Sequence, residues 1–161
     1  MIAIRDNFPR FTSEEYFAWE EQQQCRHEYI DGEIYALTGG TLNHGRIALN
    51  LGALLKNHLR GSGCQTGNSD CRVNIQGSDD YVYPDVSVTC DRRDRTATQF
   101  ITYPYLIVEV LSPSTEAYDR GNKFRMYRRT STLQDYVLVD TNSVTIDLYR
   151  KDEAGNWQII N

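Results

Sequence analysis

Apolar residues recur at helical spacing between residues 41 and 60, which predicts an amphipathic helix that ends at Gly61. The apolar positions behind this prediction are Ile47, Leu51, Leu54, Leu55 and Leu59. A second helix, from about residue 12 to 24, is predicted by a capping box in which Thr12 caps the first turn and Glu15 reaches back. The 112–115 stretch predicts the capped start of a third helix, which ends near Arg129.

The remaining apolar segments are short and bounded by turn residues, which is typical of strands. Asp31-Gly32 lies between two alternating runs and predicts a hairpin, because both residues of such a turn must accept positive φ. The other predicted strands are 64–67, 71–75, 81–89, 105–111, 135–140, 143–149 and a weak one around Trp157 and Ile159. A strand-helix-strand crossover after 105–111 predicts an α/β fold, a mixed sheet flanked by helices.

Length and composition predict one globular domain over residues 1–161, with the helix and hairpin of 11–38 packed on its core. Hydrophobic residues make up 40% and charged residues 24%, which is ordinary for a soluble protein. No apolar run is long enough for a membrane span, and no basic stretch precedes an apolar one at the N-terminus. We therefore expect a cytoplasmic protein without membrane contact.

The cysteines and the overall charge narrow the classes of partner. No CxxC pair exists, so Cys25, Cys64, Cys71 and Cys90 are interpreted as free thiols, with a Cys64–Cys71 contact as the alternative. A net charge of −5 argues against generic, high-affinity binding to nucleic acid. Residues 92–129, however, contain eight basic residues and only four acidic ones. Both a local basic surface and a solvated helix face remain open there.

Two carboxylates stand out from their surroundings. Asp85 follows Pro84 at the start of an apolar strand, and Glu109 interrupts the apolar run 106–111. A carboxylate in an apolar strand needs a compensating partner. If the two strands are neighbours, both carboxylates can share a hard cation such as Mg²⁺ or Mn²⁺, with the carbonyl of Val110 as a further oxygen ligand. Such a cation would polarise a phosphodiester and lower the pKa of a bound water.

Five further polar residues are candidates for supporting roles. Asp119, Lys123 and Tyr127 are spaced by four and share one helix face, where Lys123 could orient a nucleophile or stabilise a charged phosphate. The alternative is an ordinary Asp119–Lys123 pair on a solvated face. Glu28 at the hairpin and His44 at the start of the long helix could be additional ligands or proton shuttles. A cap or surface role is the alternative for His44.

The runs PDVSV, LIVEVLSPST and DRGNKFRMY, preceded by HEYIDGEIYALTGG and NHGRI, resemble the PD-(D/E)xK superfamily of restriction-endonuclease-like proteins. Within it they are most similar to the Uma-type restriction endonuclease family, over residues 11 to 149. The resemblance implies a restriction-endonuclease-like fold and Mg²⁺-dependent hydrolysis of DNA. By position, Asp85 and Glu109 match the metal ligands, Lys123 the catalytic lysine and Glu28 an auxiliary acid.

One position departs from the superfamily pattern. The superfamily places a lysine two residues after the second acid, where this chain has Leu111, so Lys123 on the following helix would supply that function. The resemblance thus predicts a metal-dependent endonuclease, expected to form a homodimer so that two sites address two strands. The alternatives are a catalytically inactive fold of the same type that binds nucleic acid or protein, and a phosphodiesterase acting on small nucleotides.

Overall fold

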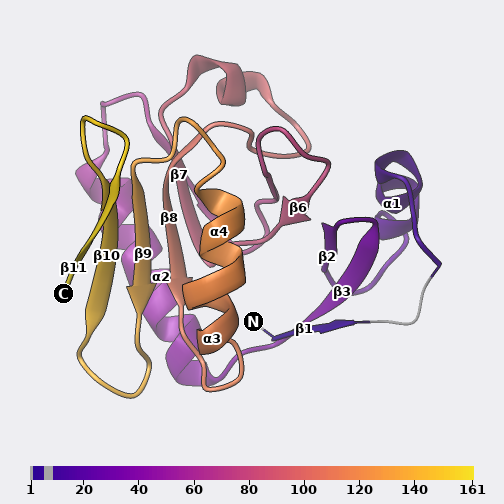
Figure 1. Cartoon of the computed structure of the whole chain (residues 1–161), viewed down its shortest axis with the longest axis horizontal. Helices are drawn as coiled ribbons and strands as arrows, with labels where there is room; N and C mark the ends of the chain where they lie inside the picture. The colour runs from indigo at the N-terminus through magenta and orange to yellow at the C-terminus, as the bar shows by residue number, and fades with distance from the viewer. Residues whose placement is uncertain (1, 6–8) are drawn as a thin grey trace.

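The computed structural model describes residues 2–5 and 9–161, with side chains from residue 9 onward. Its body is a six-stranded sheet with helix α2 on one face and the helical segment α3–α4 on the other (Figure 1). The sheet order is β11-β10-β9-β8-β7-β4. The strands are β4 (Gln65–Asn68), β7 (Val86–Thr89), β8 (Pro104–Val110), β9 (Asp135–Val139), β10 (Ile146–Lys151) and β11 (Trp157–Ile160).

Strands β8 and β9 are parallel, and the other neighbours in this sheet are antiparallel. The parallel pair runs in register from Leu106 opposite Asp135 to Val110 opposite Val139. A parallel pair needs a crossover connection, which the helical segment after β8 provides. The predicted mixed α/β sheet flanked by helices is therefore confirmed.

A second, five-stranded antiparallel sheet has the order β1-β3-β2-β6-β5. Its elements, with the helix beside it, are β1 (Ile2–Arg5), β2 (His27–Ile30), β3 (Glu33–Thr38), β5 (Val73–Asn74), β6 (Tyr81–Val82) and α1 (Ser13–Glu20). The hairpin turn is as predicted, since Asp31 and Gly32 both have positive φ. The capping box of α1 is also confirmed, with both of its hydrogen bonds between Thr12 and Glu15 formed.

Helix α2 (Leu42–His58) begins where predicted, because the side chain of Thr41 accepts a hydrogen bond from the amide of His44. The face of α2 that packs on the sheet is narrower than the sequence pattern indicated. Ile47, Leu51 and Leu55 contact the valines of the sheet, whereas Leu54 is 66% exposed. Leu54 follows Leu51 by three positions and precedes Leu55 by one, so it falls at the edge of the stripe and points to solvent.

The third predicted helix is real but irregular. It consists of α3 (Glu116–Tyr118), one wide π-helical turn (Asp119–Lys123) and α4 (Phe124–Tyr127). The expected side-chain cap is wrong, because Thr115 caps no amide through its hydroxyl. Instead the backbone carbonyl of Ser112 accepts from the amides of Thr115 and Glu116. The π-helical turn lengthens the spacing between hydrogen-bonded residues, a feature that is frequent at functional sites.

The predicted strand 81–89 is split between the two sheets. β6 ends at Val82 in the five-stranded sheet, and β7 begins at Val86 in the six-stranded sheet. Pro84 lies in the break, where its missing N–H cannot contribute to either ladder. Asp85 consequently sits at a bend between the sheets and not inside a continuous strand.

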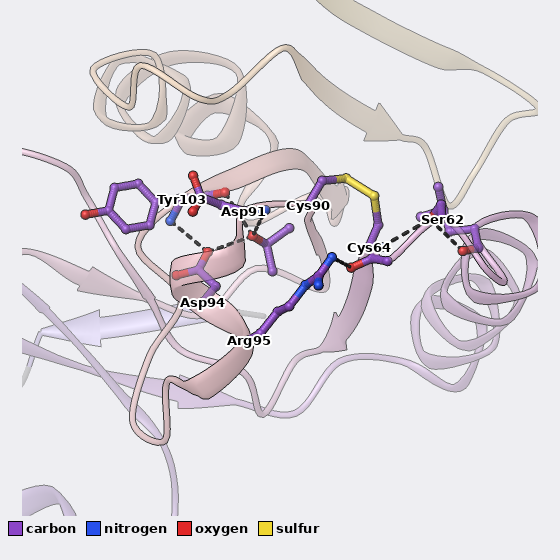
Figure 2. Close-up of a disulfide and its surroundings, with 10 residues drawn as sticks. Ser62, Cys64, Cys90, Asp91, Asp94, Arg95 and Tyr103 are labelled. Atoms are coloured by element: carbon purple, nitrogen blue, oxygen red, sulfur yellow. Dashed lines mark hydrogen bonds between the residues drawn. A yellow bond between two sulfur atoms is a disulfide. The ribbon is translucent and has the colours of Figure 1, made fainter.

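The interpretation of all four cysteines as free thiols is wrong, as is the Cys64–Cys71 alternative. Cys64 and Cys90 form a disulfide (Figure 2). Cys25 and Cys71 are free. The cause is strand register: Gln65 pairs with Thr89, so the next pair outward brings Cys64 opposite Cys90, with their Cα atoms 4.1 Å apart. The short 3₁₀ helix η1 (Arg92–Thr96) follows, and its Arg95 donates to the carbonyl of Gly63. Among the described residues, no helix is long and apolar enough to cross a membrane.

Candidate functional site

Asp85 and Glu109 lie next to each other at one end of the β7–β8 pair. Val86 pairs with Val108 in the antiparallel ladder, so the next position outward places Asp85 across from Glu109. Both residues are 3% exposed, and the charge of Asp85 contributes to raising the pKa of Glu109. Strand pairing therefore brings together the two acids that the sequence singled out.

The buried carboxyl group of Glu109 is compensated by two side chains of the helical segment that packs on the sheet. The Nζ of Lys123 lies 3.0 Å from its Oε1, and the hydroxyl of Tyr127 donates to the same oxygen at 3.2 Å. Burial raises the pKa of Glu109 from 4.5 to about 8, Lys123 opposes this rise, and the charges of Asp119 and Asp85 add to it. The sequence argument that this carboxylate needs a cationic partner agrees with this geometry.

Lys123 is buried among carboxylates, and the solvated Asp119–Lys123 pair that was the alternative is wrong. Besides Glu109, its Nζ lies 3.4 Å from Oε1 of Glu28 on strand β2. Burial by itself would lower the pKa of Lys123, but Glu109, Glu28 and Asp119 together raise it well above the ordinary 10.5. The ammonium group thus stays charged. Glu28 is held in turn by the amide of Tyr83, which donates to its Oε1 at 3.0 Å.

Asp85 has a different environment, because one of its partners, His44, comes from helix α2. The Nε2 of His44 lies 3.2 Å from its Oδ2, and the amide of Val110 donates to the same oxygen at 2.8 Å. Burial by itself would raise the pKa of Asp85, but the hydrogen bonds from His44 and Val110 outweigh burial and lower it. Asp85 is therefore the carboxylate that stays ionised. His44 is buried, so its interpretation as a surface histidine is wrong. Its backbone amide does take part in capping α2, by donating a hydrogen bond to the side chain of Thr41.

Asp119 and Tyr127 complete the buried layer around Lys123. Burial raises the pKa of Asp119, while Lys123 and a hydrogen bond with Thr115 oppose the rise. The backbone carbonyl of Asp119 accepts from the hydroxyl of Tyr136, which lies on β9. Sequence reasoning did not single out Tyr136, since the chain has eleven tyrosines and nothing in a strand sequence marks one of them as the neighbour of a helix turn.

A groove of about 720 Å³ opens beside Asp85 and His44, between α2 and β4. Asp85 and His44 form part of its lining, and Lys56 lies on the same groove further along α2. A small molecule or part of a chain can therefore approach Asp85 along this side of the sheet. Pockets of roughly 300–1,000 Å³ are the usual size for ligand sites.

The site can be compared with what a metal ion needs. The donor chemistry fits Mg²⁺ or Mn²⁺, because Asp85 and Glu109 offer carboxylate oxygens from neighbouring positions, and Mg²⁺ commonly uses one or two carboxylates with water. The part of the chain that the structure describes contains no group of three or more His, Cys, Asp or Glu side chains placed to hold a metal. Any metal at this site would therefore rely on two side chains, the backbone and water.

Comparison with known proteins decides the relationship that the motifs indicated. The model of the Uma2 family, described as "Putative restriction endonuclease", matches residues 13–161. The chain belongs to the Uma2 family. Two relatives from Synechocystis sp., each described as "Uncharacterized protein", are 58% and 36% identical. The first match covers 96% of this chain and 81% of the relative, and the second covers 91% and 84%.

The fold also matches a solved structure, that of a "putative nuclease belonging to DUF820" from Anabaena variabilis. The TM-score is 0.74, and the match covers 93% of this chain and 84% of the other at 18% identity. The restriction-endonuclease-like fold expected from the motifs is thereby confirmed. At this identity the likeness concerns the fold alone.

The raised pKa of Glu109 predicts a specific pH dependence of stability. Between about pH 4.5 and 8 the folded state holds a proton on Glu109 that the unfolded state has released, so the Glu109 contribution to the free energy of unfolding falls as pH rises. The Glu109→Gln variant lacks this contribution. We expect wild type to lose stability relative to the variant across that range, as measured by urea unfolding at several pH values. Parallel stability curves for the two proteins would show that Glu109 has no raised pKa.

Proposed function

We propose that the protein is a metal-dependent endonuclease that hydrolyses phosphodiester bonds in DNA. The observation that carries this proposal is the position of Asp85, directly before β7, beside Glu109 on the paired strand β8, with the Nζ of Lys123 3.0 Å from Oε1 of Glu109. Two acids at one end of a strand pair, with a lysine from the helical segment beside them, suit a site that binds a cation and a phosphate together. Membership of the Uma2 family supports the same class of reaction.

Each residue has a role that follows from its contacts. Asp85 and Glu109 would hold Mg²⁺ or Mn²⁺, which would polarise the phosphate and lower the pKa of an attacking water. Lys123 is a permanent buried cation, suited to stabilising the charge that develops on the phosphate. His44 and the amide of Val110 fix the orientation of the Asp85 carboxylate. Glu28 acts at a distance, as the second carboxylate that keeps Lys123 in place.

Cleavage assays with matched variants test this proposal. We expect supercoiled plasmid or circular single-stranded DNA to be cut with Mg²⁺ or Mn²⁺ and left intact with EDTA. Asp85→Asn and Glu109→Gln should each lower the rate more than about 100-fold, since even residues that only orient metal ligands are worth 10–100-fold. Glu153→Gln, which changes an exposed loop carboxylate, is the control and should cut like wild type.

A second candidate is a binding protein with the same fold and no hydrolytic activity. It is favoured by the Lys123–Glu109 ion pair, which already compensates the acid without a metal. If folded wild-type protein cuts neither the plasmid nor the single-stranded circle, with Mg²⁺ or with Mn²⁺, the endonuclease proposal is ruled out and this candidate is favoured. The homodimer stays a prediction, which light scattering of the purified protein would check.

A further inference from the structure

The groove between α2 and β4 has two unlike walls. The α2 wall presents small and apolar side chains, among them Ala48, Leu49 and Ala53. The facing wall is β4 and the turn after it, where Thr66, Asn68 and Ser69 are polar and uncharged. One wall thus offers apolar contact area, and the other offers hydrogen-bonding groups.

The charges along the groove are few. Its lining includes one carboxylate, Asp85, and one ammonium group, Lys56, in a chain whose net charge is −5. Proteins that bind double-stranded DNA neutralise several phosphates with lysine and arginine, because the duplex carries a dense row of negative charge. A groove with a single lysine does not supply such a row. It can pair with about one phosphate.

The apolar wall favours a ligand with exposed flat, apolar faces. Leu49 lines the groove and is 72% exposed, so its side chain can contact a ligand there. The bases of a double helix are stacked and paired, whereas those of an unpaired strand present their faces to a protein surface. Stacking and apolar contact with bases then replace part of the missing electrostatic attraction.

Size and position agree with this choice. A volume of about 720 Å³ lies within the range of sites for small ligands, so the groove accommodates a few nucleotides and not a double helix. Asp85 lines one end of the groove but is only 3% exposed, which places it deep relative to the surface. A phosphodiester that reaches Asp85 along this groove must therefore belong to a strand thin enough to enter.

We propose that the α2–β4 groove binds an unpaired nucleic-acid strand, which makes single-stranded segments the substrate of the site. This inference rests on the proposed phosphodiester chemistry at Asp85 and adds the structural class of the substrate. Lys56 pairs with a backbone phosphate, Leu49 contacts base faces, and the polar groups of β4 contact sugar or base edges. Deoxyribose and ribose strands share this chemistry.

Binding measured apart from cleavage tests the proposal. Fluorescence anisotropy with a labelled oligonucleotide of about twelve nucleotides, in EDTA, compares the single strand with the same strand annealed to its complement. We expect the single strand to bind at least about tenfold more tightly than the duplex. Leu49→Glu should weaken binding of the strand by about tenfold or more, because it places a carboxylate beside the phosphates. An RNA strand of the same sequence shows which sugar is preferred.

Leu54→Glu is the matched control, since Leu54 is 66% exposed on the same helix but does not line the groove. It should bind like wild type. Duplex binding as tight as single-strand binding, equal losses in the two leucine variants, or no binding of either probe would each overturn the proposal. Because none of these measurements needs cleavage, a protein that binds single strands and cuts nothing would refute the endonuclease proposal and leave the groove assignment standing.

Discussion

Replacing Lys123 with methionine should destabilise the protein by about 3–5 kcal/mol, the usual cost of removing one partner of a buried ion pair. The change leaves Glu109 and Glu28, which now lie 3.0 Å and 3.4 Å from the ammonium group, without their cation. Asp119 loses the same compensation. Methionine has nearly the same length and fills the space, so the loss reports charge and not packing. The measurement is the free energy of unfolding in urea at neutral pH.

Two further variants decide how that loss is interpreted. Lys56→Met removes an exposed lysine from α2 and should change stability by less than about 0.5 kcal/mol. The double variant Lys123→Met with Glu109→Gln removes both members of the closest pair and should recover part of the loss, as expected for coupled residues. A loss below about 1 kcal/mol in Lys123→Met would show that the carboxylates of the site are not held by this lysine.

Reducing the Cys64–Cys90 disulfide should lower the free energy of unfolding by about 3.5 kcal/mol, the loop-closure estimate for a separation of 26 residues. The bond ties β4, the outer strand of the six-stranded sheet, to the end of β7. Without it, the unfolded chain gains freedom and the sheet edge is held by its ladder alone. Urea unfolding with and without a reductant measures the difference.

Serine variants supply the controls for this experiment. The Cys64→Ser, Cys90→Ser double variant should match the reduced wild type and show no further response to reductant. Cys25→Ser removes an exposed free thiol and should behave like wild type under both conditions. If reductant leaves the stability of wild type unchanged, the pair does not form a disulfide in solution. Its formation also requires an oxidising environment or oxidant, which the expected cytoplasmic location does not ordinarily provide.

Much of the fold could be predicted because its signals are local. The capping box at Thr12 and the Asp31-Gly32 turn each depend on residues within a few positions of one another. The two acids of the candidate site could also be recognised, because a charged side chain is unusual in or beside an apolar strand segment. Helical spacing placed Lys123 and Tyr127 on one face, although it could not tell whether that face meets solvent or the sheet.

What could not be predicted depends on which strands pair and in what register. The Cys64–Cys90 bond follows from the β4–β7 register, and no local pattern contains that information. The break at Pro84 was missed because the segments on both sides, 81–83 and 86–89, each have the composition of a strand. Its consequence is that neighbouring strands in the sequence belong to different sheets. Long-range pairing, and not local propensity, determines such features.

The short link around Pro84 also joins the candidate site to the β2–β3 hairpin. Three residues, 83–85, join β6 of one sheet to β7 of the other, and a chain spans at most about 3.5 Å per residue, so this link has little slack. The amide of Tyr83, at its start, donates a hydrogen bond to Glu28 of the hairpin, and Asp85, at its end, belongs to the candidate site. We therefore expect a displacement of Asp85 to be transmitted to the hairpin through this short link, and a displacement of the hairpin to move the Asp85 carboxylate.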